Sequence, residues 1–164
     1  MGVDQNKMLL ILGLIGFGVL IWLQETHFKD ILEGRAQIVD GDSLTLNGER
    51  VRLLGIDAPE LAQFCDRNSG RWACGRAATK ALRAQINGGS VECEGQQFDK
   101  HNRVLATCYA GGIELNRWMV SEGWAVSFGG IYQGEELAAR SEKKGIWQSK
   151  FELPHIWRRQ NPRY

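Results

Sequence analysis

The chain of 164 residues, with 43% hydrophobic residues and a formal net charge of +1, has the size of one domain with a short appendage. A domain of this length buries a hydrophobic core without outside help, and the sequence contains no internal repeat and no low-complexity segment. The near-balanced charge does not indicate an acidic or a basic partner, so any electrostatic preference has to arise locally.

The first feature in chain order is an unbroken run of apolar residues and glycines from Met8 to Leu23. The run has no polar face, which argues against a soluble amphipathic helix. It is slightly short for a membrane-spanning helix and long for the core of a signal peptide, but no Ala-x-Ala cleavage site follows it. We therefore expect an uncleaved transmembrane signal anchor over residues 1–23 and a short charged connection over residues 24–32. The alternative is a secreted protein whose signal is removed.

The next predicted element is a β-hairpin within residues 39–60. Apolar residues alternate on both sides of Asn47-Gly48, which is the strongest two-residue turn signal for a hairpin. With the turn at this position, Ser43 lies opposite Arg52. Asp42 is then placed at the open end of the hairpin, close to Arg52.

A sharp bend is predicted at Asp57-Ala58-Pro59-Glu60, because proline fixes its own φ and keeps the preceding residue out of the helical region. The bend turns Glu60 back toward Asp57. Three carboxylates and an arginine then gather at one end of a small sheet. Such a group of like charges is costly unless a cation or a phosphate lies among them. The sequence therefore predicts an ionic binding site at this position.

Three helices and a second hairpin complete the predicted elements. The helices are expected over residues 75–86, 114–122 and 135–144. The second hairpin carries its loop at residues 99–102, which places Phe98 opposite Arg103.

The four cysteines are expected to form two disulfides. Counting outward from the second hairpin loop, Cys93 faces Cys108 at a separation compatible with a disulfide. Cys65 and Cys74 then remain as partners that bracket a polar loop. Four cysteines allow three connectivities, and only this one follows from the hairpin register. Two buried free thiols are the alternative for Cys93 and Cys108.

These segments resemble the thermonuclease (staphylococcal nuclease-like) family over roughly Glu33 to Trp147, and its bacterial extracytoplasmic branch through Arg159. The matching motifs are VDGDSLTL, RLLGIDAPE, FDKHNR, ELNRWMVSEGWA and KKGIWQSKFELPHIWRR. The resemblance implies an α+β fold in which an OB-type five-stranded β-barrel carries three helices. The corresponding domain is expected over residues 33–164, with a basic, tryptophan-containing tail.

The resemblance also implies a Ca²⁺-dependent phosphodiesterase site. At the matching positions, Asp42 and Asp57 would bind Ca²⁺ by carboxylate, and Ala58 would bind it through its backbone carbonyl. Oxygen ligands of this kind are those that a hard cation prefers.

The same resemblance gives the remaining site residues their roles. Glu60 would activate or orient the attacking water, and Arg52 and Arg103 would hold the phosphate. The residue types fit this chemistry independently, because two guanidinium forks neutralise charge that builds on the phosphoryl oxygens. Lysine would be a poorer substitute, since its ammonium acts as a point charge.

We therefore expect a Ca²⁺-dependent nuclease that hydrolyses phosphodiester bonds of DNA, RNA or both. It is expected to prefer flexible single strands, because a small barrel groove holds splayed nucleotides more readily than a rigid duplex. The alternative is a catalytically inert OB-type module that binds nucleic acid or a protein partner at the membrane. No protein partner is inferred. Paired cysteines and an anchor together predict a periplasmic or extracellular domain held at the membrane.

Overall fold

The computed structural model describes residues 30–162. The predicted anchor over residues 1–23 lies outside the described residues. Within residues 30–162, no helix has both the length and the apolar character needed to cross a membrane.

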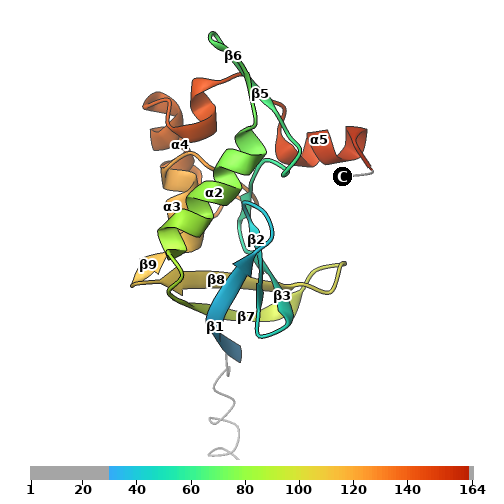
Figure 1. The fold of residues 1–164 in the computed structure, drawn as a ribbon, viewed down its shortest axis with the longest axis vertical. Coiled ribbons are helices and arrows are strands. Elements are labelled where there is room, and N and C mark those ends of the chain that lie inside the picture. Colours follow the sequence, from blue (N-terminus) through green and yellow to red (C-terminus); the bar gives the residue numbers. More distant parts are fainter. Residues whose placement is uncertain (1–29, 163–164) are drawn as a thin grey trace, which may run out of the picture.

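Five strands close into a barrel, which is seen in the lower half of Figure 1. The ring runs β3-β2-β1-β7-β8 and is closed by parallel pairing of β8 with β3. These strands are β1 Asp30–Ile38, β2 Ser43–Leu46, β3 Glu49–Leu53, β7 Ser90–Phe98 and β8 Val104–Ala110. The predicted α+β fold with a five-stranded barrel is therefore confirmed. β1 begins within the segment 24–32, where a connection was expected.

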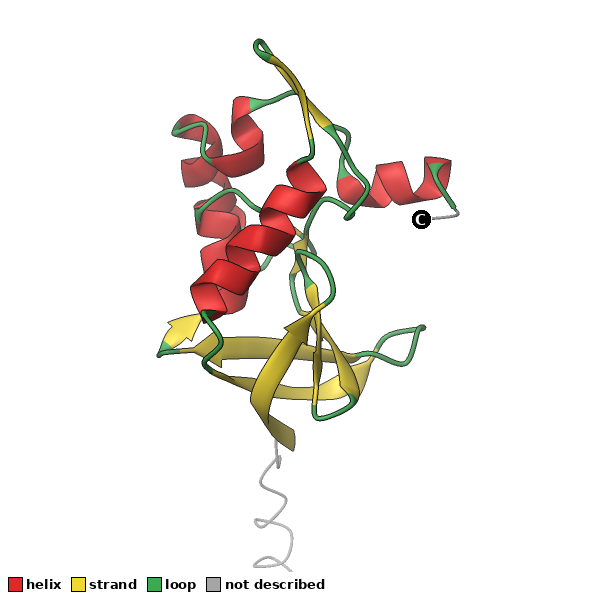
Figure 2. Ribbon diagram, in the orientation of Figure 1, coloured by secondary structure: helices red, strands yellow, loops and turns green. Residues whose placement is uncertain are grey.

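Short strands extend this framework on two sides. The strand β9 Ile113–Glu114 pairs with β8, and β4 Ile56–Asp57 pairs with β10 Val126–Ser127. β5 Cys65–Arg67 and β6 Gly70–Trp72 form a separate hairpin, which projects beyond the helices in Figure 2. The segment between Cys65 and Cys74, predicted as a polar loop, is therefore a small hairpin.

The helices lie on one end of the barrel, as Figure 1 shows. Their bounds are α2 Cys74–Ile86, α3 Leu115–Ser121, α4 Gln133–Ser141 and α5 Pro154–Gln160, with a 3₁₀ turn η1 Gly145–Gln148. The first three match the predicted helices within a few residues. α5 was not predicted. Residues 30–162 therefore contain four α-helices, where three were expected. The seven residues of α5 begin at Pro154, a favoured first helical position, but are too few to show a helical period.

The first hairpin has the predicted register. Asn47 and Gly48 have φ values of 52° and 87°, as a type I′ turn requires. Ser43 pairs with Arg52 in the ladder. The alternating side chains on the inner face, Leu44 and Leu46 among them, are at most 1% exposed and form the barrel core.

The second hairpin differs from its predicted register at the loop end. Phe98 pairs with Val104 and not with Arg103. An irregularity between Gly95 and Gln97 shifts the register by one residue, so that Cys93 and Cys108 are opposite each other as predicted.

The two disulfides join Cys65 to Cys74 and Cys93 to Cys108. The Cys93–Cys108 disulfide lies in the barrel core, whereas Cys65 and Cys74 belong to a second core with Val126 and Ile146. Partly buried residues packed against this second core are Trp72, Trp147, Phe151 and Leu153. The second core therefore fastens the segment after α4 to the β5–β6 hairpin.

Candidate active site

Two aspartates predicted as metal ligands and the arginine between them in sequence meet at the open end of the first hairpin. Arg52 Nη1 donates to Asp42 Oδ1 at 2.6 Å, and Arg52 Nη2 donates to Asp57 Oδ1 at 2.8 Å. The hairpin register explains the first contact, because Asp42 directly precedes Ser43, the ladder partner of Arg52. Asp57 is 0% exposed and Asp42 is 3% exposed. One guanidinium therefore bridges two buried carboxylates.

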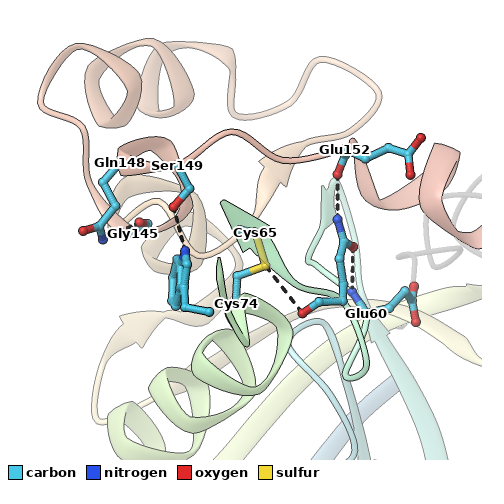
Figure 3. Close-up of a disulfide and its surroundings, with 9 residues drawn as sticks. Glu60, Cys65, Cys74, Gly145, Gln148, Ser149 and Glu152 are labelled. Carbon is cyan, nitrogen blue, oxygen red and sulfur yellow. Dashed lines mark hydrogen bonds between the residues drawn. A yellow bond between two sulfur atoms is a disulfide. The ribbon is translucent and has the colours of Figure 1, made fainter. Parts of the chain in front are cut away.

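The bend after β4 brings the next two predicted residues to the same place. The backbone N–H of Ala58 donates to Asp42 Oδ2 at 2.8 Å, and the Glu60 carboxylate faces the same cluster through Arg158. Gln63 holds the bend, because its side chain accepts from the Glu60 N–H at 3.2 Å and donates to the Glu152 carbonyl at 2.7 Å (Figure 3).

Arg103 is connected to this cluster through the hydroxyl group of Ser43. Its Nη1 donates to Ser43 Oγ at 3.2 Å, and Ser43 Oγ donates to Asp42 Oδ1 at 3.0 Å. Its Nε donates to Asp99 Oδ2 at 2.8 Å. Burial raises the pKa of Asp99, but hydrogen bonds from the backbone and side chain of Arg103 outweigh it and lower that pKa to about 2. Arg103 is therefore oriented by its own hairpin loop.

Arg158 is the site residue that reasoning from the sequence missed. It comes from α5, and its Nη1 donates to Asp57 Oδ1 at 2.8 Å and to Glu60 Oε1 at 2.6 Å. Its Nη2 lies 3.2 Å from Asp57 Oδ2. Burial lowers the pKa of Arg158, and the carboxylates of Asp57 and Glu60 more than offset this effect, so the pKa is raised. The only signal in the sequence was the Trp-Arg-Arg run in the basic tail.

His155, also on α5, approaches the same aspartate more loosely. Its Nδ1 lies 3.8 Å from Asp57 Oδ2, beyond hydrogen-bond distance. This nitrogen is buried and has no hydrogen-bond partner among the described residues. Its ring also lies against Phe128, with 6.5 Å between the ring centroids. α5 therefore brings two nitrogen-bearing side chains toward Asp57, of which only Arg158 makes direct contact.

The electrostatics of the cluster favour further positive charge. Three carboxylates, those of Asp42, Asp57 and Glu60, face two guanidinium groups, those of Arg52 and Arg158. Burial raises the pKa of Asp42 to about 7, although Arg52 and the Ala58 N–H act in the opposite direction. The raised pKa means that burial and the neighbouring carboxylates disfavour the charged form of Asp42, which a bound cation would stabilise.

The cluster fits a hard divalent cation by residue type. Asp42, Asp57 and Glu60 offer the carboxylate oxygens that Ca²⁺ prefers, and the Ala58 backbone belongs to the same turn. In the arrangement described, however, the two guanidinium groups take up these oxygens. Accordingly, no group of three or more His, Cys, Asp or Glu residues in the described chain is disposed to hold a metal ion. Arg158 contacts Asp57 Oδ2 and Glu60 Oε1, whereas Asp57 Oδ1 also accepts a hydrogen bond from Arg52.

Comparison with known proteins identifies the family. Residues 50–149 match the family model described as staphylococcal nuclease homologue. The chain is 35% identical over 142 residues to the succinoglycan biosynthesis protein ExoI of Rhizobium meliloti (strain 1021), covering 80% of this chain and 74% of that protein. It is 30% identical over 139 residues to an "Uncharacterized endonuclease" of Escherichia coli, covering 77% of this chain and 85% of that protein.

A plant protein shows the same relationship over a smaller part of its length. The chain is 30% identical over 125 residues to the "Probable staphylococcal-like nuclease CAN1" of Oryza sativa subsp. japonica, covering 73% of this chain and 35% of that protein. The segment matched by the family model includes Arg52, Asp57, Glu60 and Arg103, and it ends before Arg158. With its closed barrel and a family match over residues 50–149, this chain belongs to the family of staphylococcal nuclease homologues.

Proposed function

We propose that this protein is a Ca²⁺-dependent nuclease that hydrolyses phosphodiester bonds of DNA, RNA or both. The observation that carries the proposal is the hydrogen-bonded cluster of Asp42, Arg52, Asp57 and Glu60 at the end of the barrel, with Arg103 linked through Ser43. Relatives of the chain named as an endonuclease and as a probable nuclease support it.

Each of these side chains has a task that suits its chemistry. Glu60 is the residue that takes a proton from the attacking water, because its side chain is 21% exposed and so reaches solvent, whereas Asp57 is enclosed. Arg52 and Arg103 present paired N–H donors to the phosphoryl oxygens. Carboxylates orient both arginines, and each terminal nitrogen that donates to a carboxylate carries a second hydrogen that can be offered to a phosphate.

Asp42, Asp57 and the Ala58 carbonyl are the proposed ligands of Ca²⁺. When bound, the cation would neutralise charge on the phosphate and favour the hydroxide form of a water. The charge of the cation would repel Arg158, whose side chain is 35% exposed and can move into solvent, more readily than Arg52, which is 15% exposed and bridges two aspartates. Displacement also frees Glu60, whose carboxylate is otherwise occupied by Arg158 Nη1 at 2.6 Å.

A direct assay separates this function from the inert OB-type module. The full-length protein is incubated with single-stranded DNA, RNA and duplex DNA, in Ca²⁺ or in excess chelator. We expect cleavage of the single strands in Ca²⁺, slower cleavage of the duplex, and none in chelator. Binding without cleavage by pure protein under all conditions would establish the inert module. Such a module would have no use for three carboxylates and two arginines held together at one end of a barrel.

We also propose that residues 33–164 act outside the cytoplasm, attached to the membrane through residues 1–23. Two disulfides in a small domain suit an oxidising compartment, and the apolar run supplies an anchor. We expect the intact chain in the membrane fraction of cells, accessible to protease from outside the cytoplasm. Peptide mapping without reduction should recover Cys65 joined to Cys74 and Cys93 joined to Cys108. Soluble cytoplasmic protein in which all four thiols are alkylated would contradict the proposal.

A further inference from the structure

A cavity beside Glu60 adjoins a second cavity. One has a volume of about 390 Å³ and is lined by Glu60, and the other has a volume of about 410 Å³. They share Leu61, Ala62 and Arg76 as lining residues, so they form one groove that runs from the catalytic carboxylate. Each volume falls within the range of about 300–1,000 Å³ typical of small-molecule pockets.

The groove combines exposed apolar surface with arginines. Phe64 is 40% exposed and Leu61 is 49% exposed, which leaves apolar surface in contact with water beside the site. The guanidinium of Arg71 lies 4.8 Å from the centroid of the Phe64 ring, and that of Arg76 lies 5.8 Å from it. Trp157, on the helix that carries Arg158, adds a second aromatic side chain to the lining. Aromatic faces flanked by guanidinium groups hold stacked bases and backbone phosphates together.

Charge distinguishes this groove from another cavity of similar size. That cavity, of about 380 Å³, is lined by Glu33, Glu92 and Glu94, and its charge would repel a polyanion. The groove beside Glu60, by contrast, is lined by two arginines, and Glu60 is the only acidic residue in its lining. A polyanion approaching the site is therefore favoured on this side.

The walls of the groove stand on cross-linked parts of the structure. Phe64 adjoins Cys65, and Arg71 lies on β6 between Cys65 and Cys74, which are joined by a disulfide. The hairpin is tied to the later chain through Trp72 Nε1, which donates to Ser149 Oγ at 2.7 Å. These connections limit the entropy that the groove loses when a ligand binds.

We propose that this groove, lined by Leu61, Phe64, Arg71, Arg76 and Trp157 and called the Phe64 groove, binds the nucleotides that flank the scissile phosphate of a single-stranded nucleic acid. The proposal rests on the nuclease function argued above. Bases stack on the aromatic side chains while Arg71 and Arg76 pair with phosphates. A duplex keeps its bases stacked on each other, so the Phe64 groove selects flexible strands.

The test compares a long and a short substrate in the full-length protein. The long one is a thymidine octanucleotide, and the short one is thymidine 5′-(4-nitrophenyl phosphate), which has no flanking nucleotides. We expect Phe64→Ala, and a double variant with Arg71→Gln and Arg76→Gln, to lower kcat/KM for the octanucleotide about tenfold. Both variants should cleave the short ester within about twofold of the parent rate, since no flanking nucleotide is present to be bound. Arg83→Gln is the matched control, because Arg83 lies in the last turn of α2, the helix that also carries Arg76. This variant should cleave both substrates at the parent rate.

Binding in chelator tests the groove independently of cleavage. Fluorescence anisotropy measures the affinity for the labelled octanucleotide at several salt concentrations. The slope of log affinity against log salt concentration should be shallower in the double variant by about 1.4, at roughly 0.7 for each lost phosphate contact. If the parent cuts neither substrate, the nuclease proposal fails, and this measurement still decides whether the groove binds single strands. Equal losses on both substrates would place the effect in the active site, and unchanged octanucleotide binding in all variants would mean that the groove has another occupant. Either result overturns the inference.

Discussion

Replacing Glu60 by glutamine is expected to lower the turnover number on single-stranded DNA by about 100-fold or more. The glutamine keeps the shape of the side chain and can still accept from Arg158 Nη1, but it cannot take a proton from water. General-base catalysis is commonly worth about 10²–10⁴ in rate, which sets the size of the effect. The ligands Asp42 and Asp57 are untouched, so Ca²⁺ should still bind, although the lost Glu60 charge should raise the Ca²⁺ concentration that gives half-maximal residual activity. Single-turnover cleavage of a labelled oligonucleotide over a range of Ca²⁺ concentrations measures both quantities.

Glu152→Gln is the matched control for this change. Glu152 lies on the segment that Gln63 ties to the Glu60 bend, through its backbone carbonyl, and its carboxylate points away from that bond in Figure 3. The control should therefore cut at the parent rate. If pure, folded Glu60→Gln also cuts at the parent rate, the assignment of the base is wrong. The inert module with a contaminating nuclease would then be the better account.

Replacing Arg158 by glutamine is expected to strengthen Ca²⁺ binding by about 10- to 100-fold. The variant loses the guanidinium that occupies Asp57 and Glu60, leaving three carboxylates opposite Arg52 alone. Charges about 4 Å apart near a protein surface interact by about 4 kcal/mol at an effective dielectric constant of about 20, and relaxation of a partly exposed side chain reduces this considerably. Isothermal titration calorimetry on the full-length protein measures the affinity directly. The rise in Tm on adding Ca²⁺ should also be larger in the variant.

Arg159→Gln is a stringent control because it removes the same charge one residue further along α5. The Arg159 side chain is exposed, and its Nε donates only weakly to the His155 carbonyl, at 3.4 Å. The Ca²⁺ affinity of the Arg159→Gln variant should equal that of the parent protein. Weaker Ca²⁺ binding in Arg158→Gln would show that Arg158 positions the carboxylates for the cation, contrary to the displacement proposed here. Arg158→Lys should lie between the two, because an ammonium keeps the charge but cannot bridge two carboxylates with a planar fork.

Local sequence signals predicted the part of the site that lies within the first hairpin. Asn47-Gly48 fixes the turn, and the alternation of apolar residues fixes which face is buried. Together they determine that Ser43 pairs with Arg52, and hence that Asp42 meets the same guanidinium. Turn chemistry and side-chain period act over a few residues, so this geometry does not depend on the remainder of the chain.

The second hairpin shows where counting along the sequence fails. Loop residues alone put Phe98 opposite Arg103, whereas the structure pairs Phe98 with Val104. The one-residue irregularity near Gly95 compensates, so the pairing of Cys93 with Cys108 is the predicted one. A bulge has no strong local signature, and here its position accompanies the close packing of Gly95 against the β8 backbone at Leu105 and Ala106.

Tertiary structure alone decided that Arg158 belongs to the site. The residue is 98 positions from Glu60 in sequence, and the family match ends before it. A seven-residue helix has little stability by itself, so α5 depends on the second core and on the bond from Gln63 to the Glu152 carbonyl. The sequence by itself determined the first hairpin and the gathering of carboxylates at one end of a small sheet. Long-range packing of the C-terminal segment determined that the guanidinium of Arg158 pairs with these carboxylates, because only contacts between distant segments bring Arg158 to Asp57.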